Sequence, residues 1–166
     1  AAGSGTNPIS ETLVNTTLNP INVTYVFTLT ANGCSNTQNL VVTVNPTLSL
    51  SSSLTPPAIC SGTAFVYTAT SGTTGVTFNW TRATVAGITP VGNSGTGNVN
   101  QVLTNTTVNP INVTYVYTVS LNGCTGSNFN VVVTVNPKPI LTSTLTPAAI
   151  CSGTTFSYTP TSATAG

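Results

Sequence analysis

The chain repeats itself at a spacing of about 90 residues, and this repeat limits what the chain can fold into. Three motifs recur in the same order: Asn-Pro-Ile-Asn-Val-Thr-Tyr-Val at 19–26 and 109–116, Val-Thr-Val-Asn-Pro at 42–46 and 133–137, and Ala-Ile-Cys-Ser-Gly-Thr at 58–63 and 149–154. Solenoid coils have periods of about 20 to 50 residues, so a period near 90 fits one small domain per repeat. The sequence therefore predicts tandem domains joined end to end.

The register of the repeat divides the chain into three segments. Residues 1–46 form the C-terminal part of one repeat, 47–137 a complete repeat, and 138–166 the N-terminal part of the next. Because natural termini rarely cut domains in this way, we expect the chain to come from a longer protein. Asn-Pro stands at both segment boundaries, and proline fixes its backbone angle and donates no hydrogen bond, so short, stiff linkers are expected.

The complete repeat has the residue pattern of β-strands throughout. Apolar and polar residues alternate, the spacing of an amphipathic helix is missing, and clusters of Gly, Ser and Asn mark turns. The expected strands are 47–54, 64–70, 76–82, 99–104, 113–121 and 129–136, with a short edge strand possible within 83–97. Six or seven short strands in about 90 residues predict an all-β fold, an antiparallel β-sandwich of immunoglobulin-like type.

Alternation along the strands also predicts the core. Every second residue of a strand points to the same face of its sheet. The residues expected to point inward are Phe65, Tyr67, Ala69, Phe78, Trp80, Tyr115, Tyr117, Val119 and Leu121. The outward positions hold mainly Thr, Ser and Asn, and threonine suits them because its branched carbon favours strands while its hydroxyl contacts water.

Charged side chains are almost absent, since Glu11, Arg82 and Lys138 are the only ones and the chain has no Asp or His. Acid–base catalysis needs a positioned proton carrier, and metal sites need clustered carboxylates, imidazoles or thiolates. We therefore expect no enzyme and no metal or other cofactor. A formal net charge of +1 also argues against nucleic-acid binding, which draws its affinity from several Lys and Arg contacts to phosphate. No apolar run reaches the roughly 18 residues of a membrane span, so we expect no membrane insertion.

The four cysteines recur with the repeat, because Cys60 and Cys151 follow Ala-Ile while Cys34 and Cys124 follow Asn-Gly. We expect a disulfide between Cys60 and Cys124, with Cys34 and Cys151 paired to residues outside this chain. Closing such a loop would stabilise a small domain by about 4 kcal/mol. Two alternatives stay open: all four are free thiols, or Cys34–Cys60 and Cys124–Cys151 bridges join neighbouring repeats. A zinc or redox site is disfavoured because no CxxC pair occurs.

The aromatic and asparagine residues have competing interpretations. Trp80, two residues after Phe78 on an alternating strand, fits a sandwich core better than a sugar-binding platform. Tyr115 is placed like a tyrosine corner, whose hydroxyl bonds back to the main chain. Asn-x-Ser/Thr triplets are frequent in a chain so rich in Asn and Thr, and we interpret them as composition rather than glycosylation sites. They begin at Asn15, Asn22, Asn79, Asn105 and Asn112.

The complete repeat resembles the PKD-like repeats of Bacteroidota cell-surface proteins. The motifs that carry this resemblance are, in order, Ile-Cys-Ser-Gly-Thr, Phe-Asn-Trp, Val-Thr-Tyr-Val-Tyr-Thr-Val, Asn-Gly-Cys and Val-Thr-Val-Asn-Pro. The resemblance implies a β-sandwich with paired cysteines in a large exported adhesin or gliding-type filament, handled by a type IX secretion system. Many adhesin sandwiches are acidic and stiffen with calcium, whereas this chain has no Asp, which argues against that device here.

These features predict a structural stalk repeat of an extracellular or cell-surface fibre, a disulfide-stapled semi-rigid spacer whose partners are neighbouring repeats of the same chain. Any surface or glycan ligand would bind through another region of the protein. Two alternatives remain. The chain could be a self-assembling filament subunit joined by edge strands, since low charge removes a guard against edge pairing. It could also be a glycan- or surface-binding module that uses Thr-rich strand faces or exposed aromatic residues.

Overall fold

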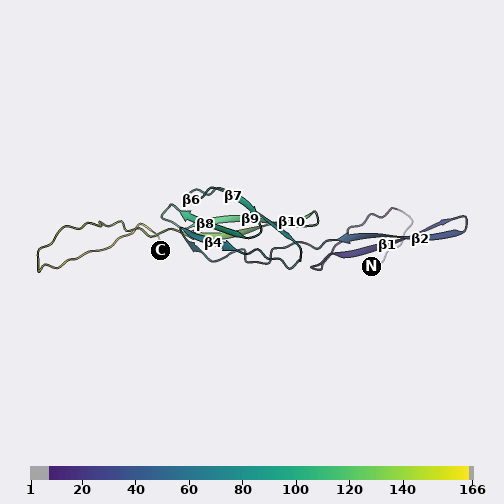
Figure 1. Ribbon diagram of the computed structural model, residues 1–166, viewed down its shortest axis with the longest axis horizontal. Helices are drawn as coiled ribbons and strands as arrows, with labels where there is room; N and C mark the ends of the chain where they lie inside the picture. Colours follow the sequence, from purple (N-terminus) through teal and green to yellow (C-terminus); the bar gives the residue numbers. More distant parts are fainter. Residues whose placement is uncertain (1–7, 165–166) are drawn as a thin grey trace.

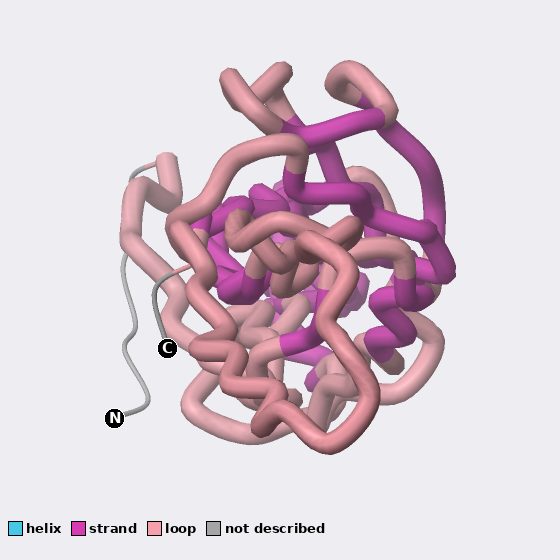
Figure 2. Tube along the Cα trace, turned by 90° about the vertical axis from the view of Figure 1, so that its left-hand side faces the viewer, coloured by secondary structure: helices cyan, strands magenta, loops and turns pink. Residues whose placement is uncertain are grey.

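The computed structural model describes residues 8–164, and every regular element in this range is a β-strand. Residues 1–7 and 165–166, parts of the first and third predicted segments, lie outside the described residues. A hairpin, a sandwich and a long loop follow one another along an elongated molecule (Figure 1). The view along its long axis likewise shows strands and loops (Figure 2). Within the described range, no helix could span a membrane.

The N-terminal hairpin pairs β1 (Ile21–Ala31) with β2 (Cys34–Val44) in an antiparallel two-stranded sheet. Its turn, Asn32-Gly33, has positive φ angles of 50° and 79°. A two-residue hairpin turn of this type needs φ above zero at both positions, which asparagine and glycine tolerate best. Much of the hairpin's apolar surface is exposed, including Val26, Phe27 and Leu40.

The central segment folds into two sheets. The larger has the order β3 (Ile59–Cys60), β10 (Cys124–Asn136), β9 (Ile111–Leu121), β5 (Thr77–Arg82) and β7 (Asn93–Thr96). The smaller has the order β4 (Thr63–Tyr67), β8 (Val99–Asn105) and β6 (Ile88–Thr89). All neighbouring strands are antiparallel except β3 and β10, which run parallel. The all-β, immunoglobulin-like sandwich is therefore confirmed.

The two sheets enclose a core in which aromatic rings from opposite sheets meet. The ring centroids of Phe65 and Tyr115 are 5.2 Å apart, and those of Tyr67 and Tyr117 are 5.4 Å apart. Trp80 meets Tyr115 edge-on at 5.5 Å. Val119 is fully buried and Phe78 is half-buried beside it; Ala69 and Leu121 are buried too. Every buried apolar residue of the described range lies between Leu48 and Val135, so this segment carries its own core.

Several parts of the central segment differ from the expected strands, among them β3, which was not expected, and β10, which begins at Cys124 instead of residue 129. Residues 47–54 form no regular strand, because they make single bonds to two different partners instead of a ladder with one. Ser51 N donates to Thr70 O at 2.8 Å, and Leu54 O accepts from Val132 N at 2.8 Å. The 83–97 loop contains two short strands, β6 and β7, on different sheets.

The third segment, 138–164, has one isolated bridge, between Leu141 and Ser162. It nevertheless keeps local contacts of the central sandwich. The Oγ of Ser143 and the hydroxyl of Tyr158 are 2.7 Å apart, like those of Ser52 and Tyr67. Its apolar side chains lack sheet partners, and Phe156 is 52% exposed.

Candidate functional site at the ends of the sandwich

The two cysteines of the central sandwich lie at its opposite ends. Cys60 is the register partner of Asn136, the last residue of β10, whereas Cys124 is the first residue of that strand. Because β10 has 13 residues and a strand rises about 3.4 Å per residue, the two cysteines are roughly 40 Å apart. A disulfide requires Cα atoms within about 7 Å. The predicted Cys60–Cys124 bridge is therefore wrong.

The four cysteines are free and exposed. Cys34 stands at the tip of the N-terminal hairpin, and this tip points away from the sandwich (Figure 1). The third segment, with Cys151, leaves the sandwich at the end opposite to Cys124. Neither Cys34–Cys60 nor Cys124–Cys151 can therefore bridge repeats within one chain of this shape.

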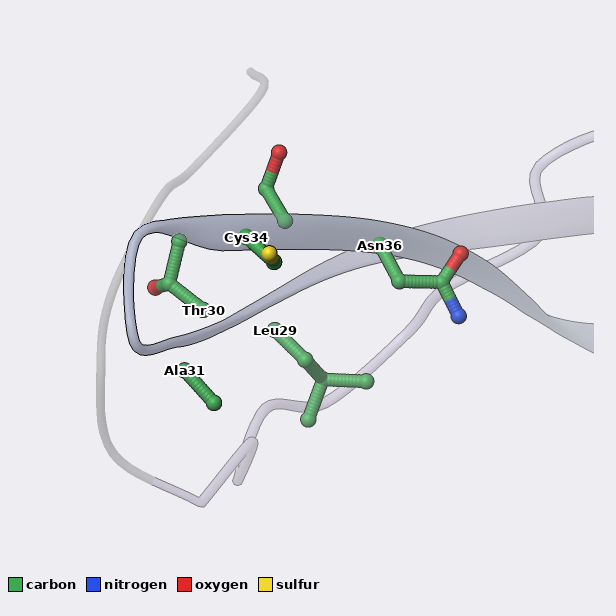
Figure 3. A pocket seen from close by; sticks show the side chains of 6 residues that line it. Leu29, Thr30, Ala31, Cys34 and Asn36 are labelled. Atoms are coloured by element: carbon green, nitrogen blue, oxygen red, sulfur yellow. The ribbon is translucent and has the colours of Figure 1, made fainter.

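A shallow hollow of about 370 Å³ lies against the hairpin tip that holds Cys34 (Figure 3). Its lining residues are Leu29, Thr30, Ala31, Cys34, Ser35 and Asn36. A second hollow lies at the corresponding tip of β9 and β10, next to Cys124, and includes Asn122 and Gly123. These hollows offer neutral hydroxyl and amide groups, and the thiol is the one chemically reactive group among the lining residues of the first.

Contacts of the first segment with the sandwich gather at the Cys124 end. Asn45 Nδ2 donates a hydrogen bond to Cys124 Sγ at 3.3 Å. Leu18 of the first segment packs against Gly72, where a Cβ would lie 3.3 Å from the leucine side chain. Side chains of the first segment therefore contact the sandwich near the junction at Pro46, and Cys124 takes part in these contacts.

The only arginine is buried and holds a loop to the sheet. Arg82 Nη2 donates to the carbonyls of Pro90 and Val91 at 3.1 and 2.8 Å, and its Nε donates to Gln101 Oε1 at 3.1 Å. Its guanidinium carbon lies 5.9 Å from the centre of the Tyr115 ring. Arg82 is 2% exposed, so the cluster serves the fold and offers no surface to a ligand.

Tyr115 also belongs to this cluster. Its hydroxyl donates to Gln101 Oε1 at 2.8 Å, so the tyrosine-corner interpretation, which required a bond to the main chain, is wrong. Burial raises the pKa of Tyr115 to about 12, although the nearby Arg82 charge lowers it in part. The hydroxyl is therefore neutral at physiological pH and acts as a hydrogen-bond donor.

The Asn-Thr-Thr motif has a structural role that sequence reasoning missed. Asn105 Nδ2 donates to the carbonyls of Asn109 and Val135 at 2.7 and 2.9 Å, while its Oδ1 accepts from the main chain and hydroxyl of Thr107 at 2.9 and 2.8 Å. Asn15 makes the same set of bonds in the first segment. Both amides are buried and fully engaged, so neither accepts a glycan. The sequence did carry a signal for this role: Asn-Thr-Thr recurs at Asn15 and Asn105, each time four residues before Asn-Pro.

In a comparison with protein families, residues 57–139 match a family described as the PKD-like domain. The matched range contains all strands of the central sandwich, from β3 to β10, and both of its cysteines. No curated protein and no solved structure matches the chain. The family is thus assigned through the sandwich, and Cys60 and Cys124 at its two ends lie in the matched range, whereas Asn45 and the N-terminal hairpin lie before it.

Proposed function

The chain belongs to the PKD-like domain family, and from this premise we propose that its sandwich is one of a tandem series of semi-rigid spacers in an extracellular or cell-surface fibre. The family is typical of structural extracellular modules in general. One observation supports the proposal of a tandem spacer: the chain enters the sandwich beside Cys124 and leaves it beside Cys60, at opposite ends. Domains with opposed termini add their full length when they are joined in series.

Recurring local geometry supports the proposal of tandem repeats. The two hairpin turns have nearly equal φ angles, 50° at Asn32 and 49° at Asn122. The side-chain bond from Thr43 to Asn22 measures 2.9 Å, and the corresponding bond from Thr134 to Asn112 measures 2.8 Å. Shared turn geometry and equivalent hydrogen bonds in the two hairpins support the proposal that the first segment belongs to a repeat of the same fold as the central sandwich.

The chemistry of the surface agrees with a passive role. The chain contains one acidic and two basic side chains, and one of these three, Arg82, is buried in the structure. A spacer needs no proton carrier, so we propose no catalytic activity. Neighbouring repeats are its proposed partners, and recognition of a surface or glycan is assigned to another region of the protein.

Small-angle scattering tests the spacer proposal. We define the extended chain as residues 1–137 followed directly by 47–166, so that the central repeat occurs twice. If repeats join end to end, the extended chain has a maximum dimension roughly 40 Å greater than the original chain, the length of β10. An increase of less than about half that value means that the repeats fold back on each other, and it contradicts the proposal.

A second candidate, self-assembly through edge strands, is favoured by the N-terminal hairpin. Within the described residues β1 and β2 pair with each other alone, so each leaves an open edge of 11 residues. Long open edges are templates for pairing with another chain. Sedimentation velocity over a hundredfold range of concentration decides this. A rising sedimentation coefficient supports assembly, and a constant value contradicts it.

A further inference from the structure

The two junctions of this chain present the same short sequence in the same structural position. Val-Thr-Val-Asn-Pro stands at the end of the second hairpin strand in both: β2 ends at Val44, just before Asn45 and Pro46, and β10 ends at Asn136, just before Pro137. Asn45 and Asn136 are therefore equivalent positions, each the last residue before the proline linker. Whatever lies beside one of them in its junction indicates what lies beside the other.

Each junction displays a different cysteine. At Pro46, Asn45 Nδ2 lies 3.3 Å from the Sγ of Cys124, which stands at the hairpin tip of the repeat that follows the junction. At Pro137, Asn136 is the register partner of Cys60, which belongs to the repeat that precedes the junction. Placing Asn45 on Asn136 brings both kinds of cysteine to one asparagine.

The side-chain directions agree with this placement. Val135 is fully buried and Ile59 packs against the core, so the next residues, Asn136 and Cys60, point to the outer face of the sheet. Paired residues of adjacent strands project on the same side, so the Cys60 thiol lies beside the Asn136 amide. In the other junction the equivalent amide contacts the tip cysteine directly.

We propose that each complete junction carries a disulfide between the Cys60-type thiol of one repeat and the hairpin-tip thiol, of the Cys124 type, in the repeat that follows. The proposal rests on the tandem arrangement proposed above. All four cysteines are exposed, so they are open to oxidation. Such a bridge crosses the proline linker beside its covalent path and removes bending freedom between neighbouring repeats.

The chemistry requires an external oxidant, a low-molecular-weight disulfide. One cysteine thiolate attacks this disulfide, forms a mixed disulfide and releases one small thiol. The second cysteine thiolate then attacks the mixed disulfide, so that the cysteine–cysteine bond forms and the second small thiol leaves. The two cysteines lose two electrons and two protons, and the oxidant gains them as its two thiols.

The extended chain contains one complete central junction, and oxidation with glutathione disulfide tests it. We expect two fewer titratable thiols per chain and one bridge, joining the first copy's Cys60 to the second copy's Cys124. Peptide mapping under non-reducing, acidic conditions detects the linked pair. Oxidation is carried out at low protein concentration, so that disulfides form within one chain. If the only disulfides found join separate chains, the proposal is overturned.

The two copies of the central repeat have the same sequence, so peptide mapping alone does not show which copy's Cys60 forms the bridge. Serine variants made in one copy at a time show this. Cys60→Ser in the first copy abolishes the bridge, whereas Cys60→Ser in the second copy leaves it intact. Equal effects of the two variants, or a Cys60–Cys124 link that survives both, would overturn the proposal. Scattering from the reduced extended chain tests the spacer role separately: a long chain without a bridge rejects the disulfide alone, and a folded-back chain rejects the spacer.

Discussion

At the scale of single residues, the buried amide of Asn105 fixes the loop that leads into β9. Replacing it with alanine leaves the carbonyls of Asn109 and Val135 and the main-chain N–H of Thr107 without their partners. Each buried polar group left unpaired costs about 1 to 3 kcal/mol, so we expect Asn105→Ala to lower the free energy of unfolding by about 3 kcal/mol. Denaturant unfolding followed by Trp80 fluorescence measures this.

An exposed asparagine provides the control for that change. Asn100 lies on β8 with its side chain exposed, so Asn100→Ala is expected to change the free energy of unfolding by less than about 0.5 kcal/mol. If both variants unfold at the same denaturant concentration as the unchanged chain, Asn105 is not the structural residue described above.

A second residue-scale prediction concerns Gly95, which lies opposite Trp80 in the pairing of β5 with β7. A Cβ at this position would come within 2.6 Å of the indole ring, and the ring cannot retreat because it packs on Tyr115. Overpacking of this kind costs about 1 to 3 kcal/mol, so Gly95→Ala is expected to destabilise the sandwich by that amount. Ser94→Ala, at the exposed neighbour, is the control. An unchanged thermal midpoint for Gly95→Ala would contradict the prediction.

At the scale of elements, the two hairpins have similar sequences but different surroundings. Tyr115 and Tyr117 on β9 are fully buried, whereas Phe27 and Leu29 on β1 are 42% and 58% exposed. A two-stranded hairpin alone is marginally stable in water, so β1–β2 should open far more often than β9–β10.

Limited digestion with chymotrypsin tests this difference. We expect early cleavage after Phe27 and in the third segment after Phe156, while a fragment that contains 47–137 persists. Mass spectrometry of the fragments over time gives the order of cleavage. Cleavage after Tyr117 as early as after Phe27 would show that the sandwich does not protect β9.

The elements also show how far sequence reasoning reaches. Alternation was sufficient to place the inward faces of β4, β5 and β9, because side-chain direction follows from strand geometry alone. It could not give the partner of each strand. The parallel pairing of β3 with the far end of β10, and the start of β10 at Cys124 instead of residue 129, depend on contacts between distant segments. Those two features put Cys60 and Cys124 at opposite ends, which the recurrence of cysteines alone does not reveal.

At the scale of the whole molecule, the charge inventory determines how stability depends on pH. The chain has no Asp or His and a single Glu, so few side chains titrate in the acid and neutral range. Its perturbed groups are tyrosines: three lie in the core, and Tyr25 lies on the N-terminal hairpin, where a hydrogen bond to Glu11 raises its pKa. Burial raises the pKa of Tyr115 to about 12 and raises the pKa values of Tyr67 and Tyr117 as well. Stability should therefore depend on pH mainly in alkaline solution.

The direction follows from the two states of these tyrosines. In the unfolded chain a tyrosine ionises near its ordinary pKa of 10.0, whereas in the folded chain the buried Tyr115 hydroxyl holds its proton until about pH 12. The free energy of unfolding is thus fully present below about pH 10 and falls as the pH rises from there toward 12. Guanidinium unfolding at pH 7, 9 and 11, with tyrosinate absorbance recorded in parallel, measures the loss.

Tyr117→Phe removes one of the buried hydroxyls and should weaken the pH dependence above pH 10, whatever it does to stability at pH 7. If the variant and the unchanged chain lose stability equally between pH 9 and 11, tyrosine burial is not the cause.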